Sequence, residues 1–284
     1  MKLVTPVEIT HAKLQIGYDT PVLLLGSCFT DEIGKRLQEA GFDVLCNPFG
    51  TLYNPLSITS CLERAMSGRG MQEEDMVQHE GVWHSWLHHS RFSHPDRETC
   101  MAHCNEAIAQ THEFLQRSPL LMVTFGTAWV FYRQGRVVAN CHKLPSQQFV
   151  RRRLSVQDIM EAWQPVLDRW SGNSLFTVSP IRHMADDAHG NQLSKATLLL
   201  AVESLMQDNP QAFYFDSYEL LLDELRDYRF YARDMCHPSE LAVDIIWERF
   251  QQTYMTEDTR RRLLEEEKAY RRSQHRAIIN KIID

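Results

Sequence analysis

The sequence predicts a doubly wound α/β fold of the flavodoxin type, a three-layer sandwich around about five parallel strands. Short and almost wholly apolar runs recur along the chain, and such runs are typical of strands buried on both faces of a parallel sheet. Segments with helical periodicity separate these runs, as the crossover connections of a parallel sheet require. Glycine or small polar residues follow several of the runs, which is typical of strands that end at functional loops.

The elements follow from these patterns in chain order. Strands are predicted at 22–26, 42–46, 120–125, 174–178 and 212–215. Helices are predicted at 31–40, 56–67, 97–116, 155–170, 191–207, 217–224 and 239–255. Gly41 marks the end of the first helix, and Ser155 is a suitable N-cap for the fourth. Gly135 separates two short extended segments and predicts a hairpin there.

Two segments depart from the alternation. Residues 71–95 are rich in aromatic residues and histidine, and we expect an irregular insertion there. Residues 256–284 are charged and lack glycine and proline, which predicts a long helix that is either exposed or bound to a partner. We therefore expect one α/β domain over 1–255 and a helical tail over 256–284, with the tail as the candidate contact in a homo-oligomer.

Composition narrows the class of protein. The chain has 284 residues, 43% of them hydrophobic, which suits one large domain. Its net charge of −7 argues against a nucleic-acid partner, and we interpret the run 151–153 of three arginines as a solvated face. No stretch resembles a signal peptide or a membrane span. The seven cysteines are odd in number and scattered, so we expect no disulfide framework and a cytoplasmic location.

The stretch 21–30, PVLLLGSCFT, carries the first candidate for chemistry. Ser27 and Cys28 follow a buried strand, and ligands of open α/β sheets collect at the carboxyl ends of strands. Either residue is a candidate nucleophile. The alternative is a buried thiol beside a hydroxyl that caps the next helix.

The second candidate is Asp234, three residues before His237 on a loop that opens the last core helix. This spacing lets the carboxylate hold one ring nitrogen while the other nitrogen points outward, which is the arrangement that a nucleophile needs from its base. The alternative makes Asp234 a capping residue and His237 an ordinary loop histidine.

Two clusters of histidine and cysteine residues are candidate metal sites. One consists of His84, His88, His89 and His94, in which His84 and His88 have the i, i+4 spacing of a zinc-binding helix. The other consists of Cys100, His103, Cys104 and His112. Neither completes a known ligand pattern, so we expect no metal and no other cofactor. The first segment is better interpreted as a loop that covers the active site.

The ordered set of motifs resembles the SGNH (GDSL-like) hydrolase superfamily, and within it the GSCFA-domain family. The turn GSCFT carries the family signature, and the resemblance covers most of residues 20–250. It extends over PFGTLYNP at 48–55, TFGTAWVF at 124–131, NCHKLP at 140–145, SPIRH at 179–183, NQLSKA at 191–196 and LRDYRFYARDMCHPS at 225–239.

The resemblance implies roles for the residues of the turn. Aligned with the Gly-Asp-Ser block of the superfamily, Cys28 takes the place of the nucleophile and Ser27 that of the aspartate. Ser27 stays an alternative nucleophile if the turn is shifted by one residue. Asp234 and His237 match the final DxxH block.

The resemblance also implies an oxyanion hole and a set of binding residues. Gly50, Gly126 and Thr127 match the oxyanion-hole blocks, but the usual asparagine is absent, so Thr127 or Asn140 would stand in for it. The expected substrate-binding residues are His89, Asn140, His142, Lys143, Arg182, His183 and Lys195. Arg182 would hold an anion or pair with Asp186, and Lys195 would serve the same anion or lie at the surface.

Two functions follow. The first is a hydrolase or acyltransferase that attacks an ester or thioester in a small-molecule or glycan-linked acyl substrate. The second is a non-catalytic module that uses the same pocket to bind a glycan or an anion.

Overall fold

The structure is a computed structural model that describes residues 5–9 and 13–283, with side chains described up to residue 273. The central strands are β1 (Val22–Gly26), β2 (Val44–Cys46), β5 (Leu120–Phe125), β9 (Ser174–Val178) and β10 (Ala212–Tyr214). The helices are α1 (Cys28–Glu39), α2 (Pro55–Ser67), α3 (Arg97–Leu115), α4 (Val156–Arg169), α5 (Asp187–Asp208), α6 (Ser217–Glu219), α7 (Glu240–Tyr254) and α8 (Glu257–Ile283).

The central sheet has five strands in the order β10-β9-β5-β1-β2, and all of its pairs are parallel. Counted along the chain within this sheet, the order is 2-1-3-4-5, which is the flavodoxin-like order. The predicted fold class is therefore confirmed, since each apolar run forms a strand of this sheet.

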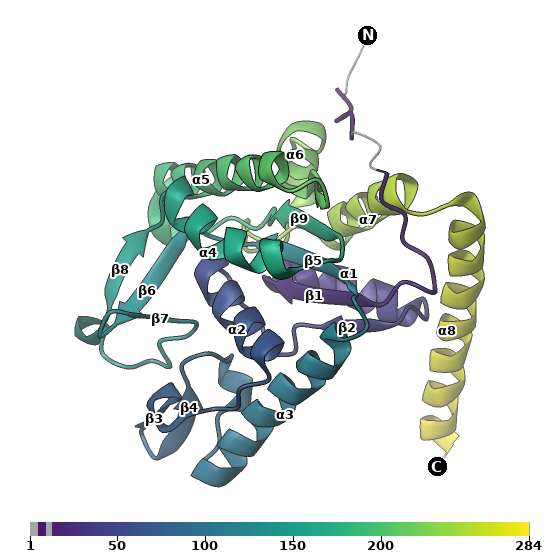
Figure 1. The fold of residues 1–284 in the computed structure, drawn as a ribbon. Helices are drawn as coiled ribbons and strands as arrows, with labels where there is room; N and C mark the ends of the chain where they lie inside the picture. Colours follow the sequence, from purple (N-terminus) through teal and green to yellow (C-terminus); the bar gives the residue numbers. More distant parts are fainter. Residues whose placement is uncertain (1–4, 10–12, 284) are drawn as a thin grey trace.

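Alternate residues of each strand face opposite sides, and each side is covered by helices (Figure 1). Leu23 and Leu25 point to the core shared with α2, α3, α4 and α5. Val22 and Leu24 point to the core shared with α1, α7 and the beginning of α8. The result is the three-layer sandwich that the wholly apolar strands require.

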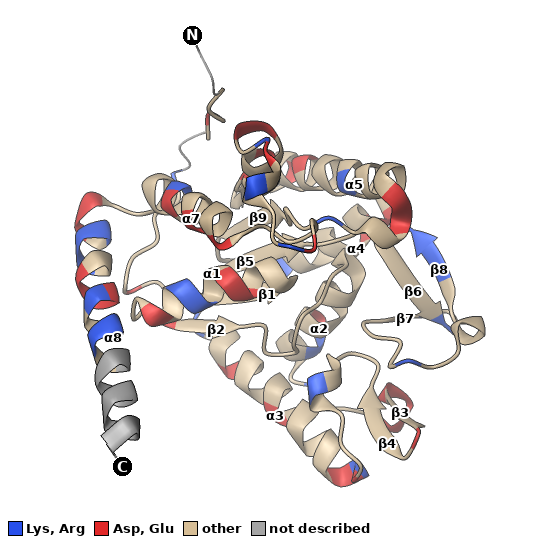
Figure 2. Cartoon of the chain, turned by 180° about the vertical axis from the view of Figure 1, so that it is seen from behind, with Lys and Arg blue, Asp and Glu red and all other residues tan. Residues whose placement is uncertain are grey.

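Two smaller sheets lie outside this sandwich. The strands β6 (Trp129–Arg133) and β7 (Arg136–Val138) form the predicted hairpin, and β8 (Val150–Arg153) pairs antiparallel with β6. Figure 2 shows β8 as a basic strand, and its three arginines are exposed, as a solvated face requires. The expected irregular insertion is more regular than predicted, because β3 (Met76–His79) and β4 (Val82–Ser85) pair within it.

The C-terminal tail forms the predicted helix, α8, and its first turns pack on the body of the protein. Leu263 is fully buried, and the guanidinium of Arg262 lies 3.8 Å from the centre of the Tyr18 ring. The division of the chain into a domain over 1–255 and a tail over 256–284 stays a prediction. The role of this tail in self-association also stays a prediction. Within the described part of the chain, no helix combines the length and apolar character needed to span a bilayer.

Candidate functional site

The carboxyl ends of β1, β5 and β9 meet at one edge of the sheet, and the loop that follows β2 crosses them. Leu52 N–H donates to Gly26 O at the end of β1 (2.9 Å), and Gly126 N–H beyond β5 donates to Tyr53 O (2.8 Å). Residues far apart in the sequence are thereby joined at the strand ends. This loop places the side chain of Tyr53 over the turn that carries Cys28.

The turn itself requires glycine at position 26. Gly26 has a φ of 149°, and a Cβ atom there would lie 2.4 Å from Thr124 O. Its N–H donates to Asn47 Oδ1 (2.8 Å), and Asn47 Nδ2 in turn donates to Asp31 Oδ1 at the start of α1 (2.7 Å). The buried Asn47 side chain therefore fixes the start of α1 relative to β1.

Cys28 begins α1, and its thiol pairs with a phenol. Cys28 Sγ and Tyr53 Oη are 3.5 Å apart. Burial, followed by this hydrogen bond, raises the pKa of Tyr53, so its hydroxyl keeps its proton and is a donor at neutral pH. Ser27, the N-cap residue, is only 1% exposed, and its Oγ has no hydrogen-bond partner among the described residues.

Asp234 and His237 form the pair that their spacing predicts. Asp234 Oδ2 lies 2.6 Å from His237 Nδ1, and Asp234 Oδ1 accepts the N–H groups of Cys236 and His237. These backbone hydrogen bonds are the main reason why the pKa of Asp234 falls to about 2. Because an ionised carboxylate only accepts, Nδ1 carries the proton and Nε2 is left for another partner.

The loop that carries this pair is tied to the end of β9. Arg182 N–H donates to Cys236 O (3.0 Å), and Arg182 Nη1 donates to Met235 O (3.2 Å). The predicted alternative for Arg182, an ion pair with Asp186, is wrong, because Asp186 pairs with Arg151 of β8. Arg182 connects the two loops of the site.

His183 lies beside Tyr53, with the two rings edge to face and their centres 6.2 Å apart. Burial, reinforced by the charge of Lys195, lowers the pKa of His183 to about 4. Its buried Nε2 has no hydrogen-bond partner among the described residues. A neutral imidazole therefore lines the cavity, with its Nε2 buried beneath the surface.

Lys195 is buried, which corrects the expectation of a surface lysine. Its Nζ donates to Gly126 O and to Ser179 O, at 2.7 Å in each case, and these carbonyls follow β5 and β9. The side chain is 1% exposed, and burial lowers its pKa to about 7. The reason is its position on α5, whose inner face packs against the strand ends. Lys195 thus connects the ends of β5 and β9 through hydrogen bonds to their carbonyl groups.

These groups border a cavity of about 520 Å³. Cys28, Tyr53, His183 and His237 all line it. Its apolar lining residues are Trp129, Phe131, Val138, Ala139, Ile181 and Ala185. Its other polar lining residues include Ser27, Asn54, Thr127, Arg182 and Asp186. The guanidinium of Arg151 also lines it, but this charge is neutralised by the buried Asp186. The cavity therefore has a polar side, which includes Cys28 and His237, and an apolar side.

The N–H groups of the three predicted oxyanion-hole residues are engaged within the protein. Gly50 N–H donates to Asn47 O (2.8 Å), and the N–H groups of Gly126 and Thr127 both donate to Tyr53 O. Thr127 Oγ1 is 3.1 Å from the hydroxyl of Ser194. In this structure these groups hold the loops of the site together.

Five of the predicted binding residues do not line the cavity: the buried Lys195, whose ammonium is held by two backbone carbonyls, and the four that follow. His142 is buried beneath the β3–β4 hairpin, where its Nε2 lies 2.7 Å from Ser85 O and its ring stacks on His84. Asn140 accepts the N–H of His142. Lys143 is exposed, and His89 packs against Gly50.

The described residues contain no group of three or more His, Cys, Asp or Glu side chains that could hold a metal ion. His84 and His88 do not share the face of a helix, because His84 lies in strand β4. His84 Nδ1 is 2.6 Å from Ser93 Oγ, whereas His88 Nδ1 is 2.8 Å from Ser85 Oγ.

Several residues of the site were not singled out from the sequence. Tyr53 belongs to the motif PFGTLYNP, but nothing in its spacing indicates a contact with Cys28. Trp129 and Phe131 are two residues apart in β6. The hairpin predicted around Gly135 therefore already implied that both lie on one face of its first strand. Arg151 was found only through the pairing of β8 with β6.

Three comparisons with known proteins bear on this site. Neither the curated proteins nor the solved structures give a match. A comparison with protein-family models matches residues 21–250 to the GSCFA family. The matched region contains every cavity-lining residue named above, together with Asp234 and the buried Lys195. Since it spans most of the sequence, the chain belongs to the GSCFA family.

Proposed function

We propose that the protein is an SGNH-like hydrolase or acyltransferase in which Cys28 attacks the carbonyl carbon of an ester or thioester. One observation carries the proposal: Cys28 and His237 line the same cavity, and the Nδ1 of His237 is held by Asp234. A nucleophile and an oriented histidine at the end of a central strand are the parts that acyl transfer needs. The link to the SGNH superfamily rests on the resemblance of these motifs.

The proposed reaction has two balanced steps. The Cys28 thiol gives its proton to His237 Nε2 and forms a thioester with the acyl group, while His237 returns the proton to the departing alcohol or thiol. Water then attacks the carbonyl carbon of the thioester and gives a proton to His237, the acyl group leaves as a carboxylic acid, and His237 returns that proton to the sulfur to restore the Cys28 thiol. An acceptor hydroxyl in place of water makes the enzyme a transferase.

Cys28 is preferred to Ser27 because its thiol is less deeply buried and already has a polar partner in the cavity, the hydroxyl of Tyr53. The oxyanion is proposed to face the start of α1. The first N–H groups of a helix have no partner within it, and Ser27 makes no side-chain cap hydrogen bond to them. The helix dipole adds positive potential at the same place.

The apolar side of the cavity supports an uncharged acyl group as the part of the substrate that is bound. Trp129 and Phe131 of β6 and Ile181 beyond β9 supply this side. Arg151, already paired with Asp186, offers less attraction to an anionic acyl group than a free arginine would. We therefore propose short apolar acyl esters as test substrates.

The test is hydrolysis of p-nitrophenyl esters of increasing acyl length. The parent protein should release p-nitrophenol, and Cys28→Ala and His237→Ala should each lower kcat/KM by at least a factor of about a hundred. Asp234→Asn, which keeps the shape of the side chain, should lower it less than His237→Ala does. Equal rates in the parent and in Cys28→Ala contradict the proposal.

A second candidate function, ligand binding without turnover, is favoured by one observation. The partner of Cys28 Sγ is Tyr53 Oη rather than a histidine nitrogen. This module would hold a glycan or an anion in the same cavity. Saturable binding of an ester that is never hydrolysed, with equal affinity in Cys28→Ala, would support this second function over the first.

A further inference from the structure

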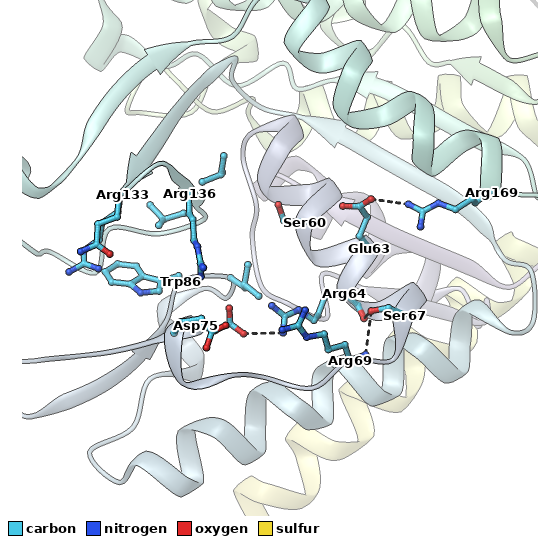
Figure 3. A pocket seen from close by; sticks show the side chains of 15 residues that line it. Ser60, Glu63, Arg64, Ser67, Arg69, Asp75, Trp86, Arg133, Arg136 and Arg169 are labelled. Atoms are coloured by element: carbon cyan, nitrogen blue, oxygen red, sulfur yellow. Dashed lines mark hydrogen bonds and ion pairs between the residues drawn. The ribbon is translucent and has the colours of Figure 1, made fainter.

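A second cavity, of about 890 Å³, lies apart from Cys28 and is lined largely by charged residues. It is bordered by α2 and the turn after it, by the β6–β7 hairpin and by the end of α4 (Figure 3). Val138 of β7 is the residue that lines both cavities. The hairpin therefore separates the proposed reactive cavity from this second one.

Arginine is the main charged residue of this second cavity. Its basic lining residues are Arg64, Arg69, Arg133, Arg136 and Arg169. Its acidic lining residues are Glu63, Glu74 and Asp75. Basic residues therefore outnumber acidic ones in this cavity, whereas the whole chain has a net charge of −7.

Two of the arginines are neutralised by the acids. Arg64 Nη1 lies 2.9 Å from Asp75 Oδ2 and also donates to Gly70 O, so this side chain supports the turn after α2. Arg169 Nη2 lies 2.8 Å from Glu63 Oε1. Both ion pairs appear as dashed lines in Figure 3. The charge of each of these two guanidinium groups is therefore already balanced by a carboxylate.

The other three arginines have no ion-pair partner among the residues that the structure describes. Arg69 and Arg136 are exposed. The guanidinium of Arg133 lies 4.8 Å from the centre of the Trp86 ring, and the ring holds it in place. Glu74 is the one acid of the lining that is not paired, so the unpaired groups carry an excess of positive charge.

We propose that this cavity binds a small molecule with at least two phosphate-like anionic groups. A guanidinium presents a planar fork of donors that matches the oxygen atoms of phosphate. Arg133 and Arg136 approach from the hairpin, whereas Arg69 approaches from the turn after α2 (Figure 3). Anionic groups at both ends of one ligand satisfy both sides. This site goes beyond the proposed acyl transfer and requires no step at Cys28.

The test is isothermal titration calorimetry of the full chain with inorganic phosphate, pyrophosphate and tripolyphosphate at low salt, where charge pairing is least screened. Pyrophosphate or tripolyphosphate should bind more tightly than phosphate, with one site per chain. Arg69→Gln and Arg136→Gln should each weaken binding on the order of tenfold, since each removes one charged hydrogen-bonding group.

Two further variants sharpen this test. Arg153→Gln is the matched control, because Arg153 is an exposed arginine that lines neither cavity. It should leave the affinity unchanged. Glu74→Gln should tighten binding, because it removes the unpaired negative charge of the lining. Circular dichroism checks that each variant is folded.

Three results would overturn the proposal: no binding of any probe, phosphate binding as tightly as the longer anions, or an Arg153→Gln loss equal to that of Arg136→Gln. Cys28→Ala should bind pyrophosphate as the parent does. Failure of the acyl-transfer proposal and failure of this one are therefore separate results.

Discussion

The hydroxyl of Tyr53 is the polar partner of the Cys28 thiol, and it bears on the reactivity of that thiol. Because Tyr53 keeps its proton at neutral pH, it donates to Cys28 when the sulfur carries negative charge. A donor to a thiolate stabilises the reactive form of the side chain. In the proposed acyl transfer, the thiol would exchange this hydrogen bond for a contact with the substrate.

Tyr53→Phe is therefore expected to slow alkylation of Cys28 by iodoacetamide severalfold at neutral pH, because the thiolate loses its donor. The rate is measured by mass spectrometry of the peptide that contains Cys28. Tyr132→Phe, which changes a tyrosine outside the cavity, is the control and should react as the parent does. An unchanged or faster rate in Tyr53→Phe would show that the hydroxyl does not assist the thiolate.

Helices and strands are positioned by close backbone contacts as well as by the burial of apolar side chains. The packing of α1 against β2 is the clearest case. Gly34 lies in the middle of α1, where glycine is normally unfavourable. A Cβ atom at this position would lie 2.3 Å from Cys46 Sγ and 3.0 Å from Cys46 Cβ. Glycine is thus required by the neighbouring strand rather than by the helix.

Gly34→Ala should lower the free energy of unfolding, although alanine is the better helix former by about 1 kcal/mol. Urea denaturation measures the change. Cys46→Ala removes the sulfur, so the double variant Gly34→Ala/Cys46→Ala should recover part of the loss, and the coupling between the two changes should be favourable. Additive losses would mean that α1 adjusts without contact with Cys46.

The sequence predicted the central elements because a strand buried on both faces leaves an uninterrupted apolar run. The β3–β4 hairpin and β8 were missed because strands of small sheets keep one polar face, and β8 contains three arginines. Lys195 was expected at the surface because a helical pattern does not reveal which carbonyls lie opposite one of its residues.

At the scale of the whole molecule, three histidines are kept neutral by burial, two of them beside Ser85 and the third beside the Cys28 cavity. Burial is the first cause that lowers the pKa of His88 to about 3, of His142 to about 4 and of His183 to about 4. Short spacings along the chain suggested binding or metal ligation for such residues. Their surroundings are formed by distant segments, which explains why the sequence did not show that His88 and His142 are packed in the interior.

These histidines predict a loss of stability in mild acid. Between about pH 4 and pH 6.5 the unfolded chain binds a proton at each position and the folded chain does not, so stability rises with pH and is lost as pH falls through this range. Each histidine contributes a slope of at most about 1.4 kcal/mol per pH unit. His88→Gln should flatten the profile measured by urea denaturation between pH 4 and 7. The exposed variant His103→Gln should leave it unchanged, and an equally steep profile in His88→Gln would contradict this account.

The most direct measurement of the central claim is the site of acylation. The protein is mixed with p-nitrophenyl acetate, quenched in acid within the first turnover and mapped by tandem mass spectrometry. The account predicts an acetyl group on Cys28 in the parent protein, no acetyl group on the corresponding peptide of Cys28→Ala, and slower acetylation of Cys28 in His237→Ala. Acetylation that is confined to Ser27 or to another cysteine, or that is unaffected by loss of His237, would contradict it.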